Sequence, residues 1–221
     1  MSIFNDISSQ IAQLLARPEF NVKFHKSSLV PESEIDDVRE VLTSVLKVRC
    51  PPAIESSIEI DDQLNAYWSA EAGPGGDTVF GEFFLRSVLL FGKRNELNST
   101  FVSKEYEGVD LRNTRVFDYY AYSGGTIHAL FPVVENVIEN RVLIFNEKQV
   151  AQTSLDYMGY LHLVRRTRGF LFWQYLFCEH INLEEYELAA IRRGLAFIEL
   201  KFPGESYSDL KQHLARLESG R

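Results

Sequence analysis

The feature that most limits the fold of this chain is a change in its hydrophobic period. Apolar residues recur at helical spacing in residues 2–16 and 33–47, and helical spacing returns after residue 153. Between residues 78 and 152 the pattern changes to short runs of β-branched and aromatic residues, which are typical of strands. This order predicts an α+β fold: a mainly antiparallel sheet of five or more strands, flanked by helices and extended by N- and C-terminal helices.

The individual elements follow from local signals such as proline breaks, glycine turns and capping residues. Residues 170–181 are almost wholly apolar, and we expect a buried helix there, with a strand as the alternative. The polar stretch 92–114 is expected to be a long loop, and Ser123-Gly124-Gly125 a tight hairpin turn. The other expected helices are 2–16, 33–47, a short one from Asp61 or Asp62 through Trp68, 153–164, 184–200 and 207–218. The expected strands are 78–85, 87–91, 115–122, 126–131, 141–146 and 149–152.

No Pro/Gly/Ser-rich linker divides the 221 residues, so we expect one domain over 1–221, with a core of about 28–177 and a helical extension over 182–221. Cys50 and Cys178 are far apart in sequence and fit free thiols better than a disulfide framework. The chain lacks an apolar run of roughly 18–20 residues, and residues 1–20 lack the apolar centre of a signal peptide. These features predict a cytoplasmic protein that does not enter the membrane.

The charge is unevenly distributed. The formal net charge is −8, which argues against a nucleic-acid partner because phosphate contacts need a basic surface. Residues 31–85 hold twelve acids against three bases, and no Lys or Arg lies between Cys50 and Leu85. A solvated acidic surface is the simplest interpretation, and a docking face for a basic protein partner is the sharper one. The residues predicted to bind such a partner are Glu55, Glu59, Asp61, Asp62, Glu71 and Asp77.

Patterns of catalysis and of cofactor or metal binding are weak. Gly73–Gly76 lacks the GK[ST] ending of a phosphate loop, and the five histidines show no metal-ligand spacing. Cys178 and His180 resemble a nucleophile and its base, but on a helix two residues this close point in nearly opposite directions. We therefore expect no catalytic residue, no cofactor and no metal.

Several segments, taken in chain order, resemble the SUKH superfamily of bacterial toxin-immunity proteins and fungal glucan-synthesis regulators. The resemblance covers about residues 28–177. It departs from the family pattern in the N-terminal helix, in the stretch 92–114 and in two extra helices after residue 182. The segments that carry it are Ser33–Lys47 with Cys50-Pro51-Pro52, Leu64–Trp68, Gly81-Glu82-Phe83, Val116-Phe117-Asp118 with Val142–Phe145, and Thr153–Leu163.

The resemblance implies a sheet cupped by helices, a binding activity without catalytic residues, and a toxin as partner. Together with the charge pattern it predicts a non-catalytic protein-binding protein, an immunity protein that meets a basic toxin domain through an acidic face. Two alternatives stay open. One is an enzyme whose site is assembled from scattered residues such as Asp118, His128 and Glu147, and the other is a regulatory scaffold in a larger assembly.

Overall fold

The computed structural model describes residues 2–45, 48–72, 76–91, 105–106, 108–120 and 127–220. The α-helices are α1 (Ile3–Leu15), α2 (Ile35–Val45), α3 (Pro52–Glu55), α4 (Val88–Phe91), α6 (Tyr157–Thr167), α7 (Glu185–Lys201) and α8 (Ser208–Ser219). Single 3-10 turns form η1 (Glu32–Glu34), η2 (Ser56–Glu59), η3 (Leu111–Asn113) and η4 (Trp173–Phe177). The strands are β1 (Asn21–Leu29), β2 (Ile60–Glu71), β3 (Thr78–Arg86), β4 (Glu105–Tyr106), β5 (Val109–Asp110), β6 (Thr114–Tyr119), β7 (His128–Val134), β8 (Val137–Ile138), β9 (Leu143–Phe145) and β10 (Val150–Gln152).

The named strands form antiparallel sheets. Three long strands make a first sheet in the order β1-β2-β3. A second sheet of five strands has the order β10-β9-β7-β6, and β8 pairs with β7. Strands β4 and β5 form a separate pair. The prediction of an α+β fold with an antiparallel sheet of at least five strands is therefore confirmed.

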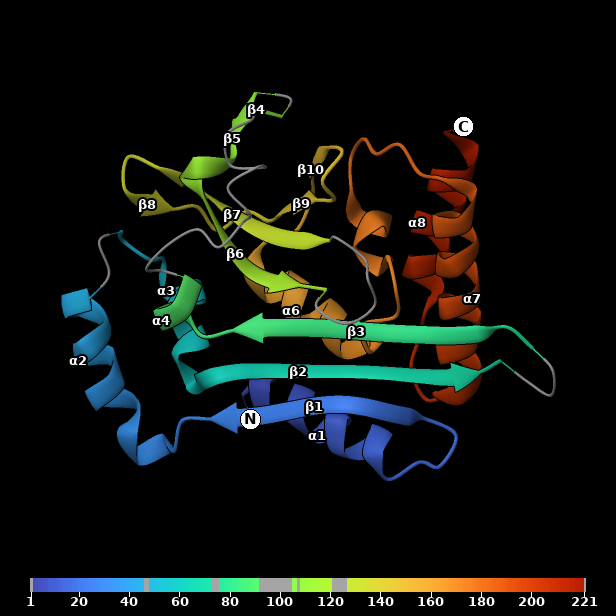
Figure 1. The fold of residues 1–221 in the computed structure, drawn as a ribbon, viewed down its shortest axis with the longest axis horizontal. Coiled ribbons are helices and arrows are strands. Elements are labelled where there is room, and N and C mark those ends of the chain that lie inside the picture. The colour runs from blue at the N-terminus through green and yellow to red at the C-terminus, as the bar shows by residue number, and fades with distance from the viewer. Residues whose placement is uncertain are drawn as a thin grey trace.

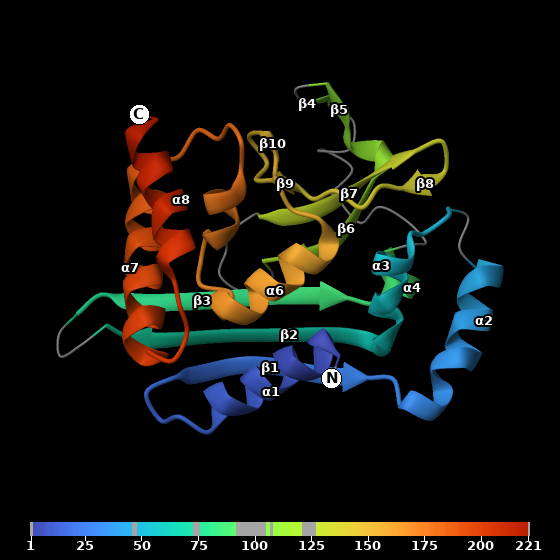
Figure 2. The same ribbon diagram turned by 180° about the vertical axis from the view of Figure 1, so that it is seen from behind.

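Helices cover one side of the first sheet. Seen from behind, α1 lies over β1 and α6 over β3, whereas from the front the three strands lie before these helices (Figures 1 and 2). Helices α7 and α8 stand at the end of the sheet where β2 runs into β3, and α2 lies at the opposite end (Figure 1). One hydrophobic core extends from Phe4 in α1 to Leu210 in α8. A smaller core on the second sheet includes Leu111, Val116 and Phe145.

Strand β2 replaces the short helix expected at Asp61–Trp68, so that expectation is wrong. Leu64 and Trp68 lie four residues apart, which fits a helix, but both also lie on one face of a strand. Every second residue from Leu64 to Ala70 points into the core, and this period of two is that of a strand. At most 5% of the surface of these residues is exposed: Leu64, Ala66, Trp68 and Ala70. Trp68 faces Gly81 across the β2–β3 pair, and a Cβ at Gly81 would lie 2.2 Å from the indole ring.

Other boundaries also differ from the expectations. Residues 88–91 form α4 and not a strand, and 170–181 contain the 3-10 turn η4 and not an α-helix or a regular strand. Strand β1 was not predicted. Residues 105–106 and 108–113 hold β4, β5 and η3, so these parts of the expected loop contain a pair of short strands and a 3-10 turn. Residues 92–104 and the expected turn at 123–125 lie outside the described residues.

Candidate functional site

The six acids predicted to bind a partner separate into two groups at opposite ends of β2. Glu55 ends α3, Glu59 lies in η2, and Asp61 and Asp62 are at the start of β2. Glu71 is the last residue of β2, and Asp77 immediately precedes β3. The twelve residues of β2 span roughly 35–40 Å at the usual rise per residue. The six acids therefore form two groups and not one cluster, and their role in binding a partner stays a prediction.

Several of these carboxylates already have partners in the fold. Lys26 on β1 forms an ion pair with Asp62, and Asp77 pairs with Arg193 at 3.1 Å. Asp61 accepts a hydrogen bond of 2.9 Å from Ser28, and Glu59 accepts one from Ser2. These ion pairs are at least 40% exposed, so each contributes little to stability.

The larger group of acids continues onto η1 and α2. Glu32, Glu34, Asp36, Asp37 and Glu40 are all exposed, and Asp36 pairs with Arg39. Helix α2 lies at the same end of the molecule as α3 and the start of β2 (Figure 1). We call the following set the acidic end: Glu32, Glu34, Asp36, Asp37, Glu40, Glu55, Glu59, Asp61 and Asp62.

The acidic end encloses a pocket of about 530 Å³ between the start of α1, the end of β1, η1 and η2. Its apolar lining comes from Leu29, Val30 and Ile35, and its two carboxylates are Glu32 and Glu59. Ser2 and Asn5 complete the lining. Aliphatic walls beneath acidic groups suit a Lys or Arg side chain, which has an apolar stem and a charged head. The sequence indicated the acids but gave no sign of this pocket, because its residues come from three separate segments of the chain.

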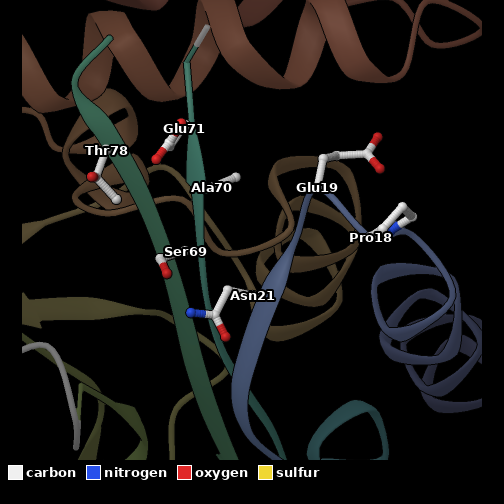
Figure 3. A pocket seen from close by; sticks show the side chains of 7 residues that line it. All are labelled: Pro18, Glu19, Asn21, Ser69, Ala70, Glu71 and Thr78. Atoms are coloured by element: carbon white, nitrogen blue, oxygen red, sulfur yellow. The ribbon is translucent and has the colours of Figure 1, made fainter. Parts of the chain in front are cut away.

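A second pocket, of about 700 Å³, lies at the other end of β2. It is lined by Pro18, Glu19, Asn21, Ser69, Ala70, Glu71 and Thr78. Glu71 and Thr78 point to one side of the strands, and Ala70 and Glu19 point to the other (Figure 3). Arg17 binds Glu19 through two nitrogens, at 2.9 and 2.6 Å, so this carboxylate is already neutralised. The pocket therefore brings Glu71 together with hydroxyl and amide groups and not with the other predicted acids.

The scattered residues of the enzyme alternative do not converge. Tyr119 pairs directly with His128, so these two side chains share a face of the second sheet, and Asp118 points to the opposite face. Asp118 is fully buried, whereas Glu147 lies in the turn between β9 and β10 with a φ of 66°. The three residues therefore form no common site.

The two thiols are held in their unreactive form by burial. Burial raises the pKa of Cys50 to about 12, and it also raises the pKa of Cys178. Cys178 is 1% exposed and donates to the Gln174 carbonyl at 3.6 Å, whereas His180 is exposed. A thiolate is the nucleophilic form, so this pair lacks the features of a catalytic dyad.

Within the described part of the chain, no three His, Cys, Asp or Glu side chains are grouped so that they could hold a metal ion. The described helices also include none with the length and hydrophobicity needed to cross a membrane. Comparisons of this chain with protein-family models, with curated proteins and with solved structures found no match.

Proposed function

We propose that this chain is a non-catalytic binding protein that docks a basic protein partner at its acidic end. The observation that carries this proposal is the pocket between Glu32 and Glu59, because it combines two carboxylates with the aliphatic walls of Leu29, Val30 and Ile35. In the proposal an Arg or Lys side chain of the partner enters this pocket. The surrounding acids attract the partner over a longer range.

The partner that fits the proposal is a basic toxin domain, and the protein then acts as its immunity protein in the cytoplasm. The resemblance to the SUKH superfamily supports this choice, and so does the acidic surface, which complements a basic domain. Occlusion needs no catalytic group on this chain, since a bound protein blocks a toxin by covering its active site. Nucleic acid does not fit, because an acidic surface repels phosphates.

The pocket can be tested with a probe that contains only the proposed anchor. N-acetyl-arginine amide would be titrated into protein labelled at Leu, Val and Ile methyl groups and followed by NMR. We expect the methyl resonances of Leu29, Val30 and Ile35 to shift, and the shifts to weaken as salt rises. N-acetyl-norleucine amide, which has an apolar chain without the charge, should produce much smaller shifts.

A matched pair of variants separates this pocket from general electrostatic attraction. Glu32→Gln with Glu59→Gln removes two negative charges from the acidic end, and Glu19→Gln with Glu71→Gln removes two from the pocket at the other end of β2. Only the first variant should abolish the shifts. An equal loss of the methyl shifts in both variants, or equal shifts with the norleucine probe, would refute a specific binding pocket for a basic side chain.

The protein-level test searches the products of the neighbouring genes for a basic toxin domain that binds this chain. Its association rate should fall with ionic strength, and reversing Asp36, Asp37 and Glu40 to Lys should lower the rate further. Association that is independent of salt would contradict the docking role of the acidic end.

A further inference from the structure

A buried carboxyl group joins the two sheets. Asp118 on β6 has no exposed surface, and its Oδ1 accepts a hydrogen bond of 2.6 Å from the backbone N–H of Phe84 on β3. Its Oδ2 accepts one of 2.6 Å from the hydroxyl of Tyr160 on α6. The register of β6 slips at Phe117, and this bulge lets Phe117 and Asp118 both face α6. Asp118 therefore links the first sheet, the second sheet and the helix behind them.

The hydrogen bonds behind Tyr160 form a chain with one direction. The backbone N–H of Phe172 donates to the Tyr120 hydroxyl at 3.0 Å, and Tyr120 donates to Oε1 of Gln174 at 2.9 Å. Nε2 of Gln174 then donates to the Tyr160 hydroxyl at 3.2 Å. The Phe172 N–H can only donate, and Oε1 of Gln174 accepts the Tyr120 hydrogen, so the later bonds run in the same direction. Every hydrogen in the chain points toward Asp118.

This direction of donation fits an ionised Asp118, because a carboxylate can only accept hydrogen bonds. It does not fit a protonated Asp118, which carries a hydrogen of its own. A proton on Oδ2 would point at the Tyr160 oxygen, which already accepts from Gln174, and the Tyr160 hydrogen would lose its acceptor. Only one hydrogen can lie between Oδ2 of Asp118 and the Tyr160 oxygen. Protonation of Asp118 on Oδ2 therefore requires the Tyr160 hydroxyl to turn.

Both protonation states are accessible near neutral pH. Burial raises the pKa of Asp118, the hydrogen bonds from Tyr160 and Phe84 oppose the rise, and the negative charge of Glu82 on β3 adds to it, so that the pKa lies at about 7. Tyr120, Tyr157 and Tyr160 are the other titratable groups coupled to Asp118, and burial raises the pKa of each. These phenols stay neutral over the range in which Asp118 titrates.

We infer that Asp118 is a proton-sensitive latch between the second sheet and α6, in which the carboxylate holds the Tyr160 hydroxyl and protonation releases it. This inference rests on the hydrogen-bond geometry and is independent of the proposed function.

Trp173 provides a natural reporter for the latch. It is fully buried, and its ring centroid lies 4.9 Å from that of Tyr160. The chain has two tryptophans, and the other, Trp68, packs against Phe20 and Phe197. With 5-fluorotryptophan incorporated, ¹⁹F NMR gives one resonance for each, assigned by Trp173→Phe. We expect the Trp173 resonance to titrate with a midpoint near the pKa of Asp118, about 7, while the protein stays folded.

Three variants test whether Asp118 is the titrating group. Asp118→Asn should abolish the titration. Glu82→Gln removes a neighbouring negative charge and should lower the midpoint, whereas Tyr160→Phe removes a donor to the carboxylate and should raise it, each by roughly one pH unit. His128→Gln is the control, because imidazole titrates in the same range and His128 faces away from Asp118.

The two opposite shifts remain decisive if Asp118→Asn does not fold. The inference is overturned if the titration is still seen in Asp118→Asn or is lost in His128→Gln. It is also overturned if the midpoint is unchanged in both Glu82→Gln and Tyr160→Phe. A Trp173 resonance that does not move between pH 5 and 9 in the folded protein would overturn it as well.

Discussion

At the scale of single residues, Gly169 shows how closely the backbone is packed against the first sheet. The backbone N–H of Glu82 donates to the Gly169 carbonyl at 2.6 Å, and the N–H of Leu171 donates to the Phe80 carbonyl at 3.0 Å. The segment after α6 thus forms hydrogen bonds with the backbone of β3 along the edge that faces away from β2. A Cβ at Gly169 would lie 2.6 Å from the carbonyl oxygen of Glu82, and its φ is +67°. Both the close approach and the left-handed backbone require glycine.

These two requirements can be separated experimentally. Gly108 also has a positive φ, +80°, but no atom lies within 4 Å of its added Cβ. Gly108→Ala should therefore show only the backbone cost, about 1 kcal/mol in the free energy of unfolding. Gly169→Ala should cost roughly 3 kcal/mol or more, because the strand edge must also move. Urea denaturation of both variants measures the difference, and equal losses would show that contact with β3 is unimportant.

At the scale of elements, residues 170–178 are buried without being a regular helix or strand. Trp173 and Leu176 have no exposed surface and Phe177 has 6%, in agreement with the prediction that this segment lies in the core. Phe172 is an exception, since it is half-buried and has a φ of 68°. The segment bends so that Phe172 can donate its N–H to Tyr120, which is a tertiary contact with no local sequence signal.

Truncating Trp173 measures how much this element contributes. We expect Trp173→Ala to lower the free energy of unfolding by about 3–5 kcal/mol, because it leaves a large cavity beside Tyr160. Tyr186→Ala is the matched control, since Tyr186 is 61% exposed and should cost less than about 1 kcal/mol. A small loss at Trp173, comparable to that at Tyr186, would mean that the segment packs less tightly than the structure shows.

Helices could be predicted from sequence where apolar residues recur on one face over three turns or more, as in α1, α7 and α8. The prediction failed at β2, because Leu64 and Trp68 satisfy both periods and only the partner strands β1 and β3 decide between them. Four of the six acids predicted to bind a partner lie in the acidic end, whereas Glu71 and Asp77 lie at the other end of β2. Their separation depends on the length of β2, and the pocket between Glu32 and Glu59 depends on contacts between distant segments.

At the scale of the whole molecule, the α2 residues whose side chains the structure describes bury less apolar surface than those of β2 and α6. In α2, Ile35 and Val38 are half-buried and pack against the core, while Asp36, Asp37, Arg39 and Glu40 are exposed. By contrast β2 is paired on both sides, and α6 buries Tyr157, Tyr160, Leu161 and Val164 completely. Local opening is favoured where few apolar contacts are lost, so the acidic helix should open far more often than the sheet behind it.

Hydrogen exchange read by mass spectrometry should reproduce this order. Amides of α2 should exchange fastest among the helices α1, α2, α6 and α7, and those of β2 and α6 should exchange only on global unfolding. Reversing Asp36 and Asp37 to Lys should leave the exchange of β2 and α6 unchanged, since exposed charges contribute little to stability. A partner docked at the acidic end should slow exchange in α2 and not in α8, which lies at the other end of the molecule (Figure 1). Protection of α2 equal to that of β2 in the free protein would contradict this order, because it would place the acidic helix within the cooperative core.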